Sequence, residues 1–426
     1  MMKSPFARIL AALIGGAVIG AVFGKTEISG TPLTDIAAPF GTMFIRLLRM
    51  SATPTIFFSL ITAAASNPPS SLGRIGIKTM GVYLLTAILA SAVALGIANT
   101  IPFSVSLPQI SGGAASVPEL RPVSLKDTIL NIVPLNPFQA LGSENILQVI
   151  FFAVASGIAL SFLRVSDSEE KRVKGETIFR FCSGVSEIMF ILIRWIMKYA
   201  PVGVFALSVD AFGRNGADVL LPLSRFIGTA YAAFAFQICV VYALLLKAAG
   251  WNVVEFFKQS RDVMLTAFVT RSSGATLPVA LETAKDKLHI PESVASFSLP
   301  LGATVNMNGV TIQQCLSVFF IAAAAGVSLD AGQQLTVVSV ILLASIGTAG
   351  IPGGAVIMLL AVLDSVGLSP VEGSAASFAY AMLLGIDALL DMGQTCLNVT
   401  GDMVCAAVVG KTEPAEHSET AKDKQP

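Results

Sequence analysis

The sequence is poor in charged residues and almost lacks histidine. Only 13% of its 426 residues are charged, 54% are hydrophobic, and the mean hydropathy is +0.76. With two histidines, His289 and His417, there is little material for histidine catalysis or metal ligation. Basic and acidic residues number 27 each, so nothing favours a nucleic-acid partner. This composition is typical of a polytopic membrane protein in a lipid bilayer.

Cysteine is also sparse. The five cysteines show no CxxC spacing, which favours small apolar packing residues over a metal or redox role. They are Cys182, Cys239, Cys315, Cys396 and Cys405. The first apolar stretch, residues 6–23, resembles a signal peptide but lacks a convincing A-x-A cleavage site. We therefore predict a retained first transmembrane helix.

The basic residues of the first half fall in three places. They are Lys3 with Arg8, Arg74 with Lys78, and the charged run 164–176, RVSDSEEKRVKGE, which we interpret as a solvated loop. Out-and-back helix pairs would bring all three to one side, and the positive-inside rule makes that side, with the N-terminus, cytoplasmic. The predicted helices cover residues 6–23, 36–65, 79–99, 176–209 and 224–248, with one further helix ending near Leu163.

The second half contains two apolar segments that are broken at their centres. FVTRSSGATLPVA (268–280) and ASIGTAGIPGGAV (344–356) each place small polar residues and a proline within an apolar run. Broken segments in corresponding positions indicate re-entrant hairpins of a secondary transporter. The alternative is that the glycines and serines serve close helix packing.

A polar stripe runs along the last apolar segment. In DALLDMGQTCLNVTGD the residues Asp387, Asp391, Gln394, Asn398 and Asp402 share one helix face. Carboxylates at membrane depth are costly unless they face a protein interior or a watery cavity, so the stripe predicts a functional site.

Four stretches, in this order, carry a family resemblance: TAFVTRSSGATLPVA, LPLGATVNMNG, SIGTAGIPG and DALLDMG-T--NVTGD, with YLLT and YAPVGVFAL upstream. The sequence from about residue 8 to 412 closely resembles the dicarboxylate/amino acid:cation symporter family. The resemblance implies an all-α polytopic fold of eight transmembrane helices and two re-entrant hairpins, with inverted repeats. It also implies a homotrimer and an elevator mechanism, in which a transport domain slides against a scaffold.

The resemblance also divides the chain into scaffold and transport domains. Scaffold helices 1 and 2 would occupy 1–72, transport helix 3 would occupy 73–100, and 101–215 would hold an extracellular loop with scaffold helices 4 and 5. The rest of the transport domain would cover 216–410, followed by a polar tail at 411–426. Its parts are helix 6, hairpin 1 (about 252–285), helix 7 (about 292–326), hairpin 2 (about 332–368) and helix 8 (about 371–410).

For the substrate, the resemblance implies that Asp391 binds the amino group and Asn398 the α-carboxylate. Ser272 and Ser273, at the tip of hairpin 1, would also hold that carboxylate, and Thr395 would line the pocket. The tip of hairpin 2 would act as the gate; its residues are Gly350, Ile351, Pro352 and Gly353.

For sodium, the resemblance implies oxygen cages, which hard cations prefer. The first site would combine Asp402 with backbone oxygens of Gly302, Asn306 and Asn398. The second would use mainly backbone carbonyls of Thr304, Met307, Ser345, Ile346 and Thr348. Asp387 is either an acid that supports these ligands or a structural hydrogen-bond acceptor.

Three positions depart from the family pattern. Gln394 stands where members that carry acidic substrates have arginine, and a neutral amide favours neutral side chains such as those of serine, threonine, alanine, asparagine or glutamine. Asn308 replaces an aspartate, and Ala87 replaces a serine of a third sodium site, although Tyr83 and Thr86 match. We expect that site to be absent or altered, with fewer sodium ions coupled per substrate.

Arg271 leaves the choice between neutral and acidic substrates open, because its positive charge could balance that of Asp391 or attract the acidic side chain of a substrate. The predicted function is a sodium-coupled amino acid symporter in a bacterial inner membrane, without an organic cofactor. One alternative is a symporter of acidic amino acids or C4-dicarboxylates, coupled to sodium, protons or both. A passive anion channel gated by amino acids, or a receptor that only senses them, is a further alternative. An intramembrane aspartyl protease is disfavoured because Asp387 and Asp391 lie on one helix and the GxGD signature is missing.

Overall fold

The computed structural model describes residues 5–66, 74–101, 103, 133–142, 146–215, 220–345, 354–371 and 374–413. In these residues the chain is almost entirely helical. The exception is a small antiparallel hairpin of β1 (Glu27–Ile28) and β2 (Thr31–Pro32), with Ile28 opposite Thr31. The helical architecture predicted from the sequence is therefore confirmed for the described part of the chain.

The helices of the first half are α1 (Pro5–Phe23), α2 (Leu33–Ser66), α3 (Arg74–Thr100), α5 (Pro137–Gly142), α6 (Ile146–Arg164) and α7 (Glu169–Asn215). A second set follows: α8 (Leu220–Phe236), η3 (Gln237–Tyr242), α9 (Ala243–Ala248), α10 (Val253–Thr270), α11 (Ser273–Glu282) and η4 (Thr283–Lys287). The last set is α12 (Glu292–Val305), α13 (Asn308–Ala324), α14 (Ala331–Ser345), α15 (Gly354–Ser365) and α16 (Ala375–Gly410).

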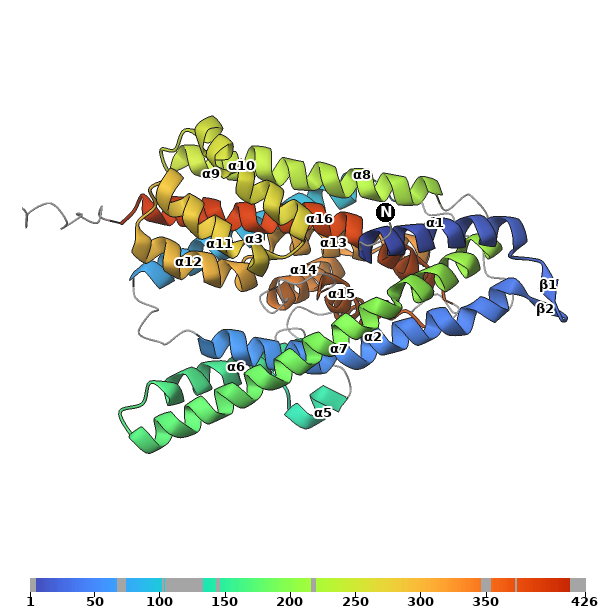
Figure 1. The fold of residues 1–426 in the computed structure, drawn as a ribbon, viewed down its shortest axis with the longest axis horizontal. Helices are drawn as coiled ribbons and strands as arrows, with labels where there is room; N and C mark the ends of the chain where they lie inside the picture. Colours follow the sequence, from blue (N-terminus) through green and yellow to red (C-terminus); the bar gives the residue numbers. More distant parts are fainter. Residues whose placement is uncertain are drawn as a thin grey trace, which may run out of the picture.

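The helices form two groups (Figure 1). We call α2, α6 and α7, which pack along one another, the α7 group. We call α3, α8 to α13 and α16, with α16 at the centre, the α16 bundle. α14 and α15 lie between them and touch both, whereas α1 packs on α7 and reaches α16.

Glycines allow the close approach of helices in the α7 group. A Cβ atom on Gly157 of α6 would lie 2.8 Å from the carbonyl oxygen of Ile61 in α2. A Cβ on Gly175 of α7 would lie 2.9 Å from the backbone nitrogen of Arg164 at the end of α6. Any larger residue would push these backbones apart, so the three helices are held together at one end.

The charged run 164–176 is helical over most of its length, which corrects the predicted loop. Only residues 165–168 connect α6 to α7, and α7 begins at Glu169. Glu169 and Glu170 occupy its first turn and pair with Arg172 and Lys174. Acidic residues at a helix N-terminus and pairs three or four residues apart both stabilise a helix, so the solvated run forms one.

Several helices can cross a membrane. In the described residues four are long and apolar enough: α3, the continuous segment Leu221–Ala248, Glu292–Ala324 and α16. A fifth span results if α7, which is bent next to residue 197, counts as one. The protein is thus a multi-pass membrane protein. Eight spans with inverted repeats stay a prediction.

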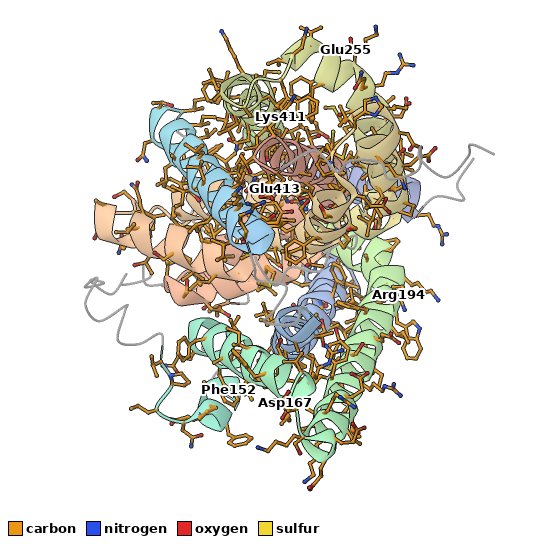
Figure 2. The ribbon with its side chains drawn as sticks, turned by 90° about the vertical axis from the view of Figure 1, so that its left-hand side faces the viewer. Phe152, Asp167, Arg194, Glu255, Lys411 and Glu413 are labelled. Atoms are coloured by element: carbon orange, nitrogen blue, oxygen red, sulfur yellow. The ribbon has the colours of Figure 1, made fainter. Side chains whose placement is uncertain are left out.

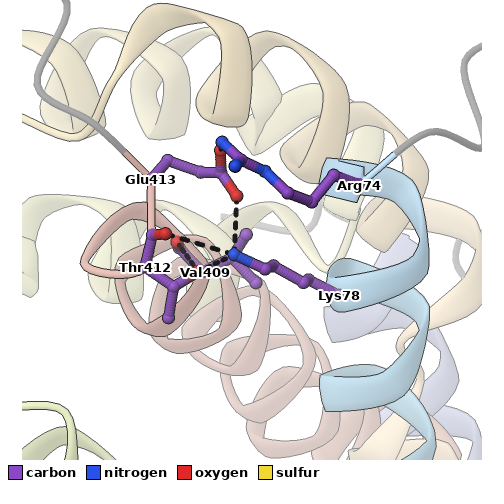
Figure 3. Close-up of polar contacts among 5 residues, drawn as sticks. All are labelled: Arg74, Lys78, Val409, Thr412 and Glu413. Atoms are coloured by element: carbon purple, nitrogen blue, oxygen red, sulfur yellow. Dashed lines mark hydrogen bonds and ion pairs between the residues drawn. The ribbon is translucent and has the colours of Figure 1, made fainter.

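An ionic contact joins the start of α3 to the end of α16 (Figure 3). Lys78 Nζ donates to Glu413 Oε1 at 2.8 Å and to the carbonyl oxygen of Thr412 at 3.1 Å, and Arg74 also pairs with Glu413. The hydrogen bond from Lys78, reinforced by Arg74, lowers the pKa of the Glu413 carboxyl. Arg74 and Lys78 belong to α3 itself, which therefore begins five residues before the helix predicted at 79–99 from the apolar pattern.

Figure 1 places the start of α3 and the α6–α7 connection at the same end of the helices, and Figure 2 looks at that end with Glu413 and Asp167 labelled. Two of the three basic clusters therefore share one side, as the sequence predicted. Its assignment to the cytoplasm stays a prediction.

Candidate functional site

The polar stripe of α16 is buried inside the protein. Asp387, Asp391, Gln394, Asn398 and Asp402 are all buried, each no more than 7% exposed. α16 contacts α10, α12 and α13 along its length, and Ser374 caps its N-terminus by accepting a hydrogen bond from the Ser377 amide. The stripe therefore faces neighbouring helices and not lipid, which is the condition under which polar residues are tolerated at this depth.

The predicted helix 7 is interrupted, which the sequence reasoning missed. α12 ends at Val305 and α13 begins at Asn308, and Asn306 and Met307 between them have non-helical backbone angles. The amide of Gly309, in the first turn of α13, donates to Asn398 Oδ1 at 2.7 Å. A helix end leaves backbone groups without helical partners, so the break exposes polar backbone beside the stripe. The NMNG sequence was the available signal, since asparagine and glycine favour non-helical backbone.

Asp402 lies at the centre of a buried polar cluster. Its Oδ1 accepts a hydrogen bond from Asn306 Nδ2 at 2.9 Å. Asn306 Oδ1 in turn accepts from Thr86 Oγ1 and from Asn308 Nδ2, both at 3.1 Å. Residues predicted for the first and third sodium sites are thus brought together in one place.

Gly302 and Tyr83 close this cluster. A Cβ on Gly302 would lie 2.5 Å from Asp402 Oδ1 and 2.6 Å from the Tyr83 hydroxyl, so both side chains pack directly against the backbone of Gly302. Tyr83 donates to the Ser298 carbonyl at 2.6 Å. One carboxylate among neutral oxygens suits a monovalent hard cation. In the described residues, no group of three or more His, Cys, Asp or Glu could hold a metal ion.

Two further residues of the cluster, Gln237 and Tyr242, were not predicted from the sequence. Asn308 Nδ2 donates to the Tyr242 hydroxyl at 2.8 Å, and Gln237 Nε2 donates to the Thr86 carbonyl at 3.5 Å. Both side chains are completely buried, at the two ends of the π-helical segment η3. Such segments occur often at functional sites. A glutamine and a tyrosine five residues apart in the apolar run AFQICVVYALL were the signal.

One of the two carboxylate oxygens of Asp391 has no hydrogen-bond donor among the described residues. Its Oδ1 accepts from Gln394 Nε2 at 3.1 Å and from Thr395 Oγ1 at 3.2 Å. Asp391 Oδ2 and Gln394 Oε1 are buried and have no hydrogen-bond partner among the described residues. A buried acceptor without a donor is costly, so this pair of oxygens is an arrangement that a ligand's donors would complete.

The tip of the first predicted hairpin lies between α10 and α11, as expected. Arg271 there adopts a left-handed backbone conformation with φ 53°, and Ser272 caps α11 by accepting from the Ala275 amide at 3.2 Å. Ser273 is buried. The charge of Arg271 acts on both Asp387 and Asp391, and Gln313 Nε2 donates to Asp387 Oδ1 at 3.4 Å. Arg271 is therefore within electrostatic reach of both carboxylates.

The second predicted sodium site is only partly described. Met307 is buried, and its sulfur accepts from Asn398 Nδ2 at 3.2 Å. Ser345 is buried at the end of α14, whereas the Thr304 side chain is exposed and donates to the Leu301 carbonyl. The remaining predicted residues of this site and of the gate lie outside the described residues: Ile346, Thr348, Gly350, Ile351, Pro352 and Gly353.

Comparison with known proteins places the whole chain in one family. The family model described as "Sodium:dicarboxylate symporter family" matches residues 6–412. The chain is 32% identical over 424 residues to the "Proton/sodium-glutamate symport protein" of Bacillus caldotenax, covering 97% of this chain and 96% of that protein. It is 30% identical to the "Proton/glutamate-aspartate symporter" of Escherichia coli (strain K12), over 95% of this chain and 92% of that protein. A "C4-dicarboxylate transport protein" of Xanthomonas campestris pv. campestris (strain B100) is 29% identical over 93% of this chain and 86% of its own length.

Proposed function

Because the chain belongs to the sodium:dicarboxylate symporter family, we propose that it accumulates small amino acids with neutral polar side chains, driven by a sodium or proton gradient. The family consists of transporters and not enzymes, and the relatives named above are symporters. Their printed substrates are glutamate, aspartate and C4-dicarboxylates. The proposed substrate has a neutral side chain instead of an acidic one, and this difference rests on one residue, Gln394.

Gln394 carries the substrate proposal. Its amide nitrogen is engaged by Asp391 Oδ1, so its oxygen is the atom left to meet a ligand. An amide oxygen accepts a hydrogen bond and repels a carboxylate. A substrate side chain with a hydroxyl or amide donor therefore fits beside it, which favours serine, threonine, asparagine or glutamine over alanine.

The zwitterionic part of the substrate fits the remaining groups. Asp391 Oδ2 would accept from the ammonium group, and Asn398 with Ser272 and Ser273 would donate to the α-carboxylate. Asn398 Nδ2 now donates to the sulfur of Met307, which is a weak acceptor. Exchanging that contact for a carboxylate oxygen replaces a weak hydrogen bond by a stronger, charge-assisted one.

The proposal includes fewer coupled sodium ions than a three-sodium transporter uses. Asn308 Nδ2 donates to the Tyr242 hydroxyl and to Asn306 Oδ1, and the Thr86 hydroxyl also donates to Asn306 Oδ1, so two residues of the degenerate third site are engaged in neutral hydrogen bonds. A cation there would have to displace those hydrogen bonds and would find no carboxylate at position 308. Sodium would instead bind beside Asp402. Elevator movement, the trimer and the gate at 350–353 complete the proposal as expectations from the family.

The test is uptake of radiolabelled serine into sealed vesicles that contain the full chain, with sodium and proton gradients imposed separately. Accumulation above the external concentration is expected under a cation gradient and none without it. Plotted against sodium concentration, initial rates should rise less steeply than for three coupled ions. Equilibration without accumulation under every imposed gradient would indicate a passive channel, and a three-ion slope would contradict the altered third site.

A second candidate is an acidic substrate, which Arg271 favours. Its positive charge acts on the stripe near Asp391 and could attract a side-chain carboxylate. Excess unlabelled aspartate separates the two proposals in the same assay. Weak inhibition of serine uptake supports the neutral substrate, and strong inhibition assigns the pocket to acidic substrates.

A further inference from the structure

A cavity lined by both charged and apolar side chains lies away from the stripe, at the end of the α7 group. It has a volume of about 390 Å³ and opens where α2 ends, α6 ends and α7 begins. Its lining includes Ala65, Ser161, Arg164, Arg172 and Glu176. The close backbone approaches at Gly157 and Gly175 fix the three helices around it. The cavity is therefore formed by backbones that have little freedom to move.

Arg164 is held in this cavity with donors to spare. Its NH1 group donates to the Ala65 carbonyl at 2.6 Å, its Nε donates to Glu176 Oε2 at 3.1 Å, and its guanidinium lies 3.8 Å from the centre of the Phe179 ring. A guanidinium has five N–H groups, and these two bonds use two of them. The other N–H groups have no acceptor among the described residues. A guanidinium fixed in this way is pre-organised to bind an oxyanion.

The charge around the cavity favours an anion. Glu176 is shared between Arg164 and Arg180, so one carboxylate faces two guanidinium groups. Arg172 lies on the lining with its side chain 53% exposed, and it pairs with Glu169, which does not line the cavity. Arginines outnumber the carboxylates that line this site.

The cavity walls and their surroundings are also apolar. Val165 and Val173 belong to the lining and are 45% and 55% exposed. Phe162 of α6 and Phe181 of α7 are 61% and 64% exposed. A soluble anion would gain nothing from this apolar surface, whereas acyl chains would cover it.

We propose that this cavity binds the phosphodiester headgroup of an anionic phospholipid, with its acyl chains lying along the exposed apolar side chains of α6 and α7. Charge complementarity with Arg164 and Arg172 selects the anionic headgroup, and the end of a membrane-spanning helix group is where headgroups lie. The site is separate from the polar stripe and independent of the transported substrate.

Native mass spectrometry of the detergent-solubilised full chain tests this site. The probes are dioleoylphosphatidylglycerol, dioleoylphosphatidylcholine with the same acyl chains, and soluble glycerol phosphate. We expect one phosphatidylglycerol per chain, bound at least about fivefold more tightly than phosphatidylcholine. Arg172→Gln should weaken that binding about fivefold, and Arg164→Gln about tenfold.

Lys174→Gln is the matched control, because it removes one positive charge two residues from Arg172 and does not line the cavity. It should leave binding within about twofold of wild type. Equal binding of the two lipids, or equal losses in Arg172→Gln and Lys174→Gln, would overturn the proposal. Displacement of the lipid by glycerol phosphate at equal concentration would show a soluble-anion site instead. Arg172→Gln keeps the test decisive if Arg164→Gln does not fold.

Discussion

The α7 group and the α16 bundle differ in the reach of their buried side-chain hydrogen bonds, although some hydroxyls of the α16 bundle, such as that of Ser298, also bond within their own helix. In the α7 group, Thr55 donates to Ser51 and Ser208 donates to Val204, so these hydroxyls are satisfied by their own helix. In the α16 bundle, Asp402 accepts from Asn306 and Asn308 donates to Tyr242, so the bonds run between elements. A hydrogen bond within one helix needs no neighbouring helix. A hydrogen bond between elements fixes neighbouring helices relative to one another.

The difference is sharpest for atoms without a partner. In the part of the chain that the structure describes, every buried side-chain oxygen that lacks a hydrogen bond belongs to the α16 bundle; Asp391 Oδ2, Gln394 Oε1 and Asn308 Oδ1 are among them. Natural proteins rarely leave such atoms unpaired, and each needs an explanation. The ligand site proposed above would account for two of these atoms, Asp391 Oδ2 and Gln394 Oε1.

The largest expected effect follows from removing the charge of Asp391. If this carboxylate holds the substrate ammonium, Asp391→Asn should reduce serine uptake at least about a hundredfold, because a buried charged partner is lost. Uptake into vesicles with matched protein content measures this. Gln148→Ala, a change within the α7 group, serves as control and should retain uptake. Substantial uptake by Asp391→Asn would remove the ammonium assignment.

A clash within the α16 bundle should come next. A Cβ on Gly309 would lie 2.3 Å from the carbonyl oxygen of Gln394, so Gly309→Ala must separate α13 from α16. We expect a loss of about 1–3 kcal/mol in the free energy of unfolding. Gly81→Ala in α3 is the control, because no atom lies within 4 Å of its added Cβ. Equal thermal-unfolding midpoints for the two variants would contradict the tight contact at the stripe.

Restoring a carboxylate at position 308 tests the cation cluster. Asn308→Asp removes the donor that Tyr242 and Asn306 Oδ1 now share. Without sodium, the variant's free energy of unfolding should therefore fall by about 1–3 kcal/mol, because buried groups are left unsatisfied. Sodium should recover part of that loss, and thermal unfolding in sodium against choline chloride measures it. A variant as stable as wild type without sodium would show that the neutral hydrogen bonds do not matter.

The contact at the end of α16 should have the smallest effect. Glu413 has a lowered pKa in the folded protein, so its contribution is fully present above the pKa of the unfolded carboxyl and is lost as the pH falls through the lowered folded value. Glu413→Gln should lower the unfolding midpoint slightly at pH 7. Once the pH has fallen below the lowered folded pKa, the two proteins should unfold together. A difference that persists in acid would mean that packing, and not charge, accounts for the contact.

Much of the candidate site followed from the sequence because helical periodicity is local. The spacing of Asp387, Asp391, Asn398 and Asp402 placed them on one face, and burial of that face is confirmed. The helical ends were less well predicted. Glu169 begins a helix within the predicted loop, because paired charges can form a solvated helical turn as readily as a loop, and Arg74 begins α3 five residues before the helix predicted at 79–99.

The sequence by itself determined the membrane class, the polar stripe and the family, since each depends on composition, spacing or motifs along the chain. Only the tertiary structure decided which way Gln394 turns its amide, that helix 7 breaks at Asn306, and that Gln237 and Tyr242 join Asp402. The cluster around Asp402 depends on contacts between residues far apart in sequence, such as Asn308 and Tyr242, whereas Asp391, one helical turn away, orients the Gln394 amide. Hydrogen bonds across helices carry no local periodicity, so they become visible only once the helices are packed together.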